Sequence, residues 1–191
     1  MNLHGERQRV RFLLPFAVAI GPFFTEKEMK TLIFGAGNLL LSDEGFGVHC
    51  IRYLEEHYVF PPEVELYDGG TLGIMVSHKF EEADRVYLVD ILDTDGDPGE
   101  VRRFDKEDVM LKRLPGKLSP HQIGIQEVLA ICDIRGCAPA QLNVVAVVPG
   151  YLGAGAVLSS SVAASLPKVA ALIAEELRAA GVCLSARVQP K

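Results

Sequence analysis

Two adjacent acids, Asp43 and Glu44, stand within GAGNLLLSDEGFGVH at residues 35–49, directly after the apolar run at residues 31–34. Two glycines precede the acids, as they do in loops that bind nucleotide phosphates. Acids in the first turn of a helix are also stabilised by the helix dipole without any catalytic role. The stretch therefore predicts either a phosphate-binding loop or a tight turn that holds carboxylates in place.

The glycines fit a dinucleotide site poorly. Gly35 and Gly37 match the first two glycines of GxGxxG, but Leu40 stands at the third position, where glycine permits close packing of strand and helix. The acid that would bind a ribose should follow about 20 residues later, whereas Asp68 lies farther along the chain. We therefore expect no nucleotide cofactor, and we interpret the glycines as a tight turn between strand and helix.

Two further residues suit a charged site. Asp90 ends the apolar run VYLVD, where a buried carboxylate needs either a cation or several donors, such as the amides of a neighbouring loop. His121 lies in SPHQ, with Ser119 as the expected N-cap and Pro120 in the first turn of a helix. A helix N-terminus favours the neutral imidazole that a metal ligand needs. The alternative is that His121 is an ordinary surface histidine.

Other candidates for catalysis are weaker. Asp68 in DGGT has two interpretations of equal weight, a role at the site or closure of a glycine turn together with a helix cap at Thr71. Neither the HExxH helix of zinc proteases nor the GxSxG turn of serine hydrolases occurs. The hydroxyls of LSSSV, which belong to Ser159, Ser160 and Ser161, have no evident base as a partner.

Strand-like and helix-like patterns alternate from residue 31 onward. Apolar runs rich in β-branched residues predict four strands, namely TLIF at 31–34, VELYD at 64–68, VYLVD at 86–90 and LNVVAVV at 142–148. PGEVRRFD at 98–105 is expected to add an edge strand. Apolar stripes at helical spacing predict helices over 47–58, 125–132 and 166–177, the last of which stops at Gly181. This order predicts an α/β fold: one three-layer domain with a twisted, mostly parallel five-stranded sheet flanked by helices.

The predicted sheet brings the candidate residues to one place. Ligands of such sheets bind outside the carboxyl ends of the strands. Glu44 follows the first strand, Asp90 ends the third, and His121 opens a later helix. We expect these three side chains to meet at the carboxyl edge, with Asp68 close by.

Composition excludes several partners. The 191 residues carry a formal net charge of −6, so a broad basic surface for nucleic acid or anionic lipid is absent. The four cysteines show no CxxC pair or metal-finger spacing, and we expect reduced thiols in the core of a cytoplasmic protein.

The first residues differ from the rest. Three arginines lead into FLLPFAVAIGPFF, which imitates a secretory signal but is interrupted by Pro15 and Pro22 and is too short to span a bilayer. We interpret residues 1–28 as an N-terminal extension, disordered or produced by a misassigned start codon. Residues 29–185 are expected to form the domain, with a tail at 186–191 and without membrane insertion.

The chain resembles the endopeptidase family that matures nickel-iron hydrogenases by removing a C-terminal extension from the large subunit. The resemblance lies in FGAGNLLLSDEGFGVH, DGGT, VYLVD and SPHQIG, which occur in the family's order. It implies a metal site made by Glu44, Asp90 and His121. One departure follows the last strand, where Gly150 and Tyr151 stand in place of an acid found in some relatives.

The resemblance also implies a mechanism. The metal is nickel already inserted in the large-subunit precursor, and the three ligands recognise it before peptide cleavage, so catalysis by this metal-dependent endopeptidase runs through the ion. Asp68 would assist at the same site. A non-catalytic chaperone that senses nickel in the large subunit is the alternative. In either case the partner is the precursor, and we expect this protein itself to be a monomer.

Overall fold

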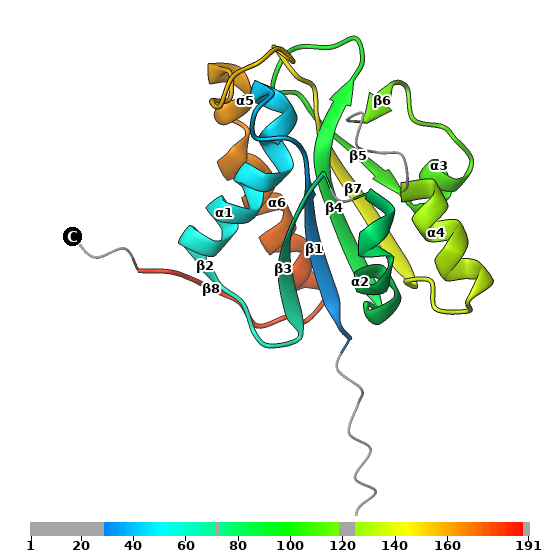
Figure 1. Ribbon diagram of the computed structural model, residues 1–191. Coiled ribbons are helices and arrows are strands. Elements are labelled where there is room, and N and C mark those ends of the chain that lie inside the picture. Colours follow the sequence, from blue (N-terminus) through cyan, green and yellow to red (C-terminus); the bar gives the residue numbers. More distant parts are fainter. Residues whose placement is uncertain (1–28, 72, 119–124, 189–191) are drawn as a thin grey trace, which may run out of the picture.

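The computed structural model describes residues 29–71, 73–118 and 125–188. Its main sheet has the strand order β3-β1-β4-β7-β5 (Figure 1). The bounds of these strands are β1 Thr31–Ala36, β3 Val64–Gly70, β4 Arg85–Asp93, β5 Val101–Asp105 and β7 Gln141–Val147. The first four strands of this order are parallel, and β5 runs antiparallel to β7. The predicted five-stranded, mostly parallel sheet is therefore confirmed.

Short strands extend this framework. Strand β6, Lys117–Leu118, pairs with the end of β4 in antiparallel orientation. Strands β2, Tyr58–Val59, and β8, Ser185–Ala186, form a separate antiparallel pair.

Helices cover both faces of the sheet. Their bounds are η1 Ser42–Gly45, α1 Phe46–His57, η2 Gly73–Val76, α2 Ser77–Glu82, α3 Lys106–Met110, α4 Ile125–Ile134, α5 Ser160–Ala163 and α6 Leu166–Ala179, where η marks a 3₁₀ helix. Figure 1 shows α1, α5 and α6 on one side of the sheet and α2, α3 and α4 on the other. The three-layer arrangement is the predicted one.

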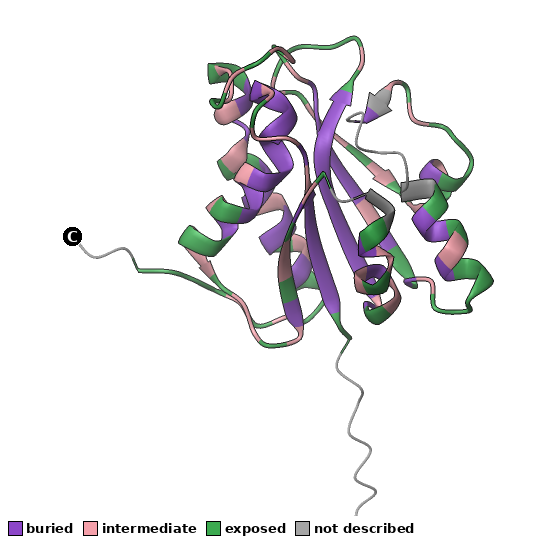
Figure 2. Ribbon diagram, viewed as in Figure 1, coloured by how far each residue is buried: buried purple, intermediate pink, exposed green. Residues whose placement is uncertain are grey.

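Buried residues lie along the central strands of the sheet and in the helices on both of its faces (Figure 2). Along β4, Val86 and Leu88 belong to the cluster that contacts α2 and α4, whereas Tyr87, Val89 and Ile91 belong to the cluster that contacts α1 and α6. Successive residues of a strand point to opposite faces, so a sheet covered on both sides needs apolar residues at nearly every position. This is why VYLVD lacks an alternating pattern.

The structure differs from the sequence expectations in detail. Helix α1 ends at His57, and Tyr58 begins β2 instead of completing the predicted stripe. No apolar stripe predicts α2, α3 or α5, because helices of four to six residues are too short to show a helical period. Helix α3 is instead defined by a capping box between Asp105 and Asp108.

The expectation of core thiols is correct for only half of the cysteines. Cys50 and Cys132 are buried, but Cys137 and Cys183 are exposed. The exposed pair lies in the segments that follow α4 and α6, where the chain has left the apolar stripe of each helix.

Within residues 29–71, 73–118 and 125–188, no helix is both long and apolar enough to span a membrane.

Candidate active site at the carboxyl edge of the sheet

The glycines after β1 allow close packing of backbone on backbone. A Cβ on Gly47 would lie 2.2 Å from the carbonyl oxygen of Ala36 and 2.3 Å from that of Val89, so helix α1 can approach β1 and β4 only with glycine there. Gly37 has a φ of +142°, and a Cβ at this position would lie 2.0 Å from the carbonyl oxygen of Glu44. The turn is thus shaped around the acidic segment.

Glu44 lies in the 3₁₀ helix η1, between the end of β1 and the start of α1. The residue is only 2 % exposed. Its carbonyl oxygen accepts a hydrogen bond from the amide of Asn38 at 3.2 Å, and its own amide donates to Leu41 at 3.1 Å. These backbone contacts hold Glu44 in one position at the carboxyl edge of the sheet.

Asp90 lies beside this segment on the neighbouring strand. Gly35 of β1 pairs with Val89, so Asp90 is level with the end of β1, and β4 contacts η1. Asp90 is fully buried, and one of its carboxylate oxygens accepts a hydrogen bond from the amide of Ile91 at 2.8 Å. Strand alternation places it on the same face as Leu88 and Leu92, which is the face covered by α4.

The proposed third ligand, His121, lies outside the described residues, as do Ser119 and Pro120. Its position therefore stays a prediction. The next described element, α4, packs through Val128 and Leu129 on the face of the sheet toward which Asp90 points. In the described part of the chain, no three His, Cys, Asp or Glu side chains form a group that could hold a metal.

Asp68 occupies a different environment on β3. It pairs in register with Gly35, so it lies at the same height as the other acids but on the opposite side of β1 from β4. Its Oδ1 accepts a hydrogen bond from the amide of Gly70 at 3.1 Å, and its Oδ2 lies 4.0 Å from the guanidinium of Arg52. The contact with Gly70 fits the turn-closing interpretation.

Asp43 binds a distant loop, a contact that the motif around it does not predict. Its buried carboxylate accepts hydrogen bonds from the loop that follows β7, which is more than one hundred residues away along the chain. No local signal marks this contact, because most of its donors are backbone amides.

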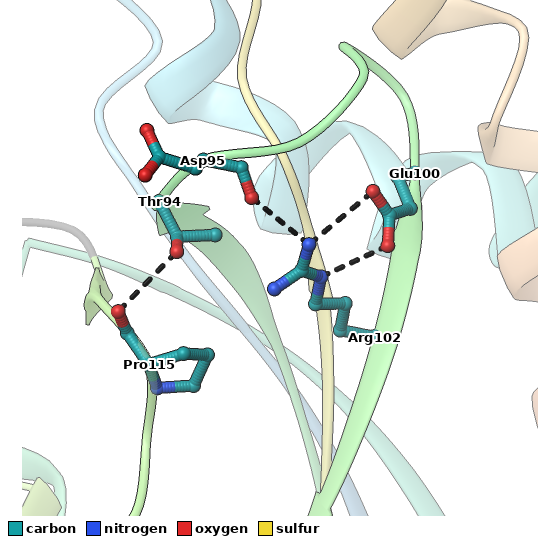
Figure 3. A network of polar contacts seen from close by, with 5 residues as sticks. All are labelled: Thr94, Asp95, Glu100, Arg102 and Pro115. Carbon is teal, nitrogen blue, oxygen red and sulfur yellow. Dashed lines mark hydrogen bonds and ion pairs between the residues drawn. The ribbon is translucent and has the colours of Figure 1, made fainter.

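The loop after β4 is fixed by a polar network (Figure 3). The guanidinium of Arg102 donates to both carboxylate oxygens of Glu100, at 3.0 and 3.3 Å, and to the carbonyl oxygen of Asp95 at 2.9 Å. The hydroxyl of Thr94 donates to the carbonyl oxygen of Pro115 at 3.3 Å. The hydrogen bond from Arg102 is the main reason that the pKa of Glu100 is lowered. These contacts hold the backbone of the loop that follows β4, the strand that carries Asp90.

His49 ends the glycine-containing motif and lies on α1, five residues after Glu44. Its Nε2 is buried and has no hydrogen-bond partner among the described residues. Burial, together with the charge of Arg52, lowers the pKa of this histidine. The ring is therefore neutral at pH 7.

The buried carboxylates of Glu44 and Asp90, at the carboxyl edge of a mostly parallel sheet that helices cover on both faces, define an α/β protein with an acidic site. The profile of the hydrogenase maturation proteases matches residues 48–176. The chain belongs to the hydrogenase maturation protease family, as its motifs predicted, and is a peptidase of hydrogenase maturation.

Individual relatives agree with this assignment. The hydrogenase expression/formation protein HoxM of Azotobacter vinelandii is 38% identical over 157 residues, which is 82% of this chain and 76% of the relative. The hydrogenase 2 maturation protease of Escherichia coli K12 is 33% identical over 81% of this chain and 94% of its own. The solved structure of the hydrogenase maturating endopeptidase HybD from E. coli superposes with a TM-score of 0.77 at 32% identity, covering 83% of this chain and 98% of that chain.

Proposed function

We propose that this protein removes the C-terminal extension of a nickel-iron hydrogenase large-subunit precursor after nickel insertion, and that it recognises the inserted nickel. The observation that carries the proposal is the placement of Glu44 and Asp90, which are both buried at the same edge of the sheet. A buried carboxylate gains most from a cation that replaces its lost hydration. The precursor supplies that cation as part of the substrate.

The chemistry is hydrolysis of one peptide bond. Nickel held between the precursor and the two carboxylates can polarise the scissile carbonyl or activate a bound water. The water oxygen then adds to the carbonyl carbon, the bond from carbon to nitrogen breaks, and the leaving amine takes up a proton. Glu44 and Asp90 act through the ion rather than as nucleophiles.

His121 is the third ligand in this proposal. A neutral imidazole beside two carboxylates would leave open positions on the ion for the peptide carbonyl and for water. The segment that contains His121 leads into α4, which covers the face toward which Asp90 points. We place the reaction in the cytoplasm, with the enzyme acting as a monomer.

The test incubates the protein with nickel-loaded or nickel-free precursor. Removal of the precursor tail is detected as a decrease in the mass of the large subunit. Wild type is expected to cut only the loaded form. His121→Ala is expected to lower cleavage of the loaded form at least about a hundredfold, which corresponds to the loss of a group that acts on the transition state. Its melting temperature should stay close to that of wild type.

His78→Ala is the matched control, because His78 is exposed on α2 and its ring forms a hydrogen bond with the carbonyl oxygen of Met75 in the preceding η2. It should cut like wild type. Nickel-dependent binding of the precursor without any mass change would replace the peptidase by a nickel-sensing chaperone. Efficient cutting of nickel-free precursor, or full activity of His121→Ala, would overturn recognition through the metal.

A further inference from the structure

Asp43 joins both ends of one loop. Its Oδ2 accepts hydrogen bonds from the amides of Gly150 and Tyr151, each at 2.8 Å, and from the hydroxyl of Ser159 at 2.9 Å. Its Oδ1 accepts from the amide of Ser159 at 2.6 Å. The Asp43 side chain is fully buried, so these four donors replace the water that it has lost. We call residues 150–159 the clamp loop.

The middle of the clamp loop forms backbone hydrogen bonds with the segment just before Asp43. The amide of Ser42 donates to the carbonyl oxygen of Gly155 at 2.8 Å, and the amide of Gly155 donates to Leu40 at 3.0 Å. A Cβ on Gly155 would lie 2.3 Å from the hydroxyl oxygen of Ser42, so a larger residue there would require the Ser42 side chain to move.

Ser42 is held in a strained conformation. Its φ is +49°, a left-handed value that is unfavourable for a residue other than glycine. Such a value persists only where the surrounding contacts enforce it. Ser42 begins η1, the turn that carries both Asp43 and Glu44, so its conformation sets the direction in which that turn leaves the glycine segment.

We propose that Asp43 is the positioning residue of Glu44. By locking the clamp loop against η1, it enforces the strained turn at Ser42 and fixes the Glu44 carboxylate where it meets the nickel of the precursor. This inference rests on the proposed function. Asp43 itself has no contact with substrate, because its oxygens are fully used by the loop.

The first test variant is Asp43→Asn, which keeps the shape of the side chain. All four contacts to Asp43 come from donors, so an amide NH₂ group faces a donor in either orientation. The second variant is Ser159→Pro, which removes the Ser159 amide and hydroxyl as donors while leaving Asp43 intact. The φ of Ser159 is −59°, a value that suits proline.

Three quantities are measured for each variant: hydrogen exchange at Gly150, Tyr151 and Ser159, the melting temperature, and the steady-state cleavage of nickel-loaded precursor. We expect faster hydrogen exchange at those of the three amides that the variant retains. We also expect KM to rise about tenfold while kcat changes less than about threefold, because Glu44 contributes to recognition of the substrate. The melting temperature should fall by about 5 °C.

Leu177→Ala is the control for instability alone. Leu177 is buried on α6, in the apolar cluster that also contains Val169 and Ile173 of the same helix. A variant that is only less stable has fewer active molecules, which lowers the apparent kcat and leaves KM unchanged. We expect this pattern for Leu177→Ala and the opposite one for both clamp variants.

The outcomes separate the two proposals. An unchanged KM in Asp43→Asn or in Ser159→Pro, together with cleavage by wild type, overturns the positioning role and leaves the proposed function standing. Failure of wild type to cut loaded precursor overturns both. A raised KM with faster exchange in the two clamp variants, and not in Leu177→Ala, supports the role of Asp43.

Discussion

The four acids of the carboxyl edge have the same charge but different surroundings. Asp43 and Asp90 are fully buried and Glu44 nearly so, whereas the side chain of Asp68 is 47% exposed and lies near Arg52. Water already solvates much of the Asp68 carboxylate, so a cation would stabilise it less than it would stabilise a buried one. Burial therefore ranks Glu44 and Asp90 above Asp68 as partners of an ion.

This ranking predicts unequal effects of two equivalent substitutions. Asp90→Asn should lower cleavage of nickel-loaded precursor about a hundredfold, because it removes a charge that would face the ion in the proposed complex. Asp68→Asn should lower it less than about fivefold, since an asparagine oxygen can still accept the hydrogen bond from Gly70. Both rates are measured by mass spectrometry under identical nickel loading, with circular dichroism to verify folding. Equal losses in the two variants would place Asp68 at the site and contradict the ranking.

At the level of elements, the strands and the long helices could be predicted from the sequence, but the contacts between distant loops could not. Apolar runs such as VYLVD predict buried strands because a doubly covered sheet leaves no polar face. The link from Asp43 to the loop after β7 had no such signal, since most of its donors are backbone amides that every residue carries. The sequence could thus suggest that Glu44 and Asp90 converge, but not what holds Glu44 in place.

The glycines of the first motif show a similar limit. Their pattern argued against a dinucleotide loop, but only the structure shows that α1 lies close to β1 and β4 at Gly47. Residues of this kind determine how near the acidic turn lies to the sheet. A substitution there should disturb the site by moving a whole helix.

Gly47→Ala tests this packing. In an open helix the change would stabilise by about 1 kcal/mol, but here the new Cβ would lie 2.2 Å and 2.3 Å from two backbone oxygens. We expect a loss of about 3 kcal/mol or more in the free energy of unfolding, measured with urea. Gly136→Ala is the control, because Gly136 has a φ of +70° but open space around it. It should cost only the backbone strain of about 1–2 kcal/mol. A Gly47→Ala protein as stable as Gly136→Ala would refute the close packing.

On the scale of the whole molecule, the sheet divides the core into two apolar clusters, whose buried members are at most 9% exposed. The cluster under α1 and α6 contains Cys50, a thiol with no exposed surface. Burial raises the pKa of Cys50 from 9.0 to about 12. The free energy of unfolding of the domain therefore depends on pH in the alkaline range. This dependence comes from Cys50, a residue that has no part in the proposed chemistry.

The direction of this linkage follows from the two pKa values. Unfolded chains release the Cys50 proton near pH 9, whereas the folded protein keeps it until about pH 12. The neutral thiol therefore contributes its full stabilisation below pH 9, and that contribution is lost as the pH rises through this window, by about 1.4 kcal/mol per pH unit. Burial also raises the pKa of Tyr87 to about 12, so the wild-type curve alone does not isolate Cys50.

A comparison with Cys50→Ala isolates it. The free energy of unfolding is measured by urea titration between pH 8 and pH 11, with a reductant present, for both proteins. At pH 8 wild type should be more stable by about 2 kcal/mol, since alanine leaves a small cavity in the core. Above pH 9 only wild type loses the thiol contribution, while Tyr87 affects both proteins alike. The two curves should therefore cross between about pH 10 and pH 11, after which the variant is the more stable protein. Curves that stay parallel up to pH 11 would mean that the Cys50 thiol ionises as easily in the folded protein as in the unfolded chain, and that water reaches the cluster beneath α1.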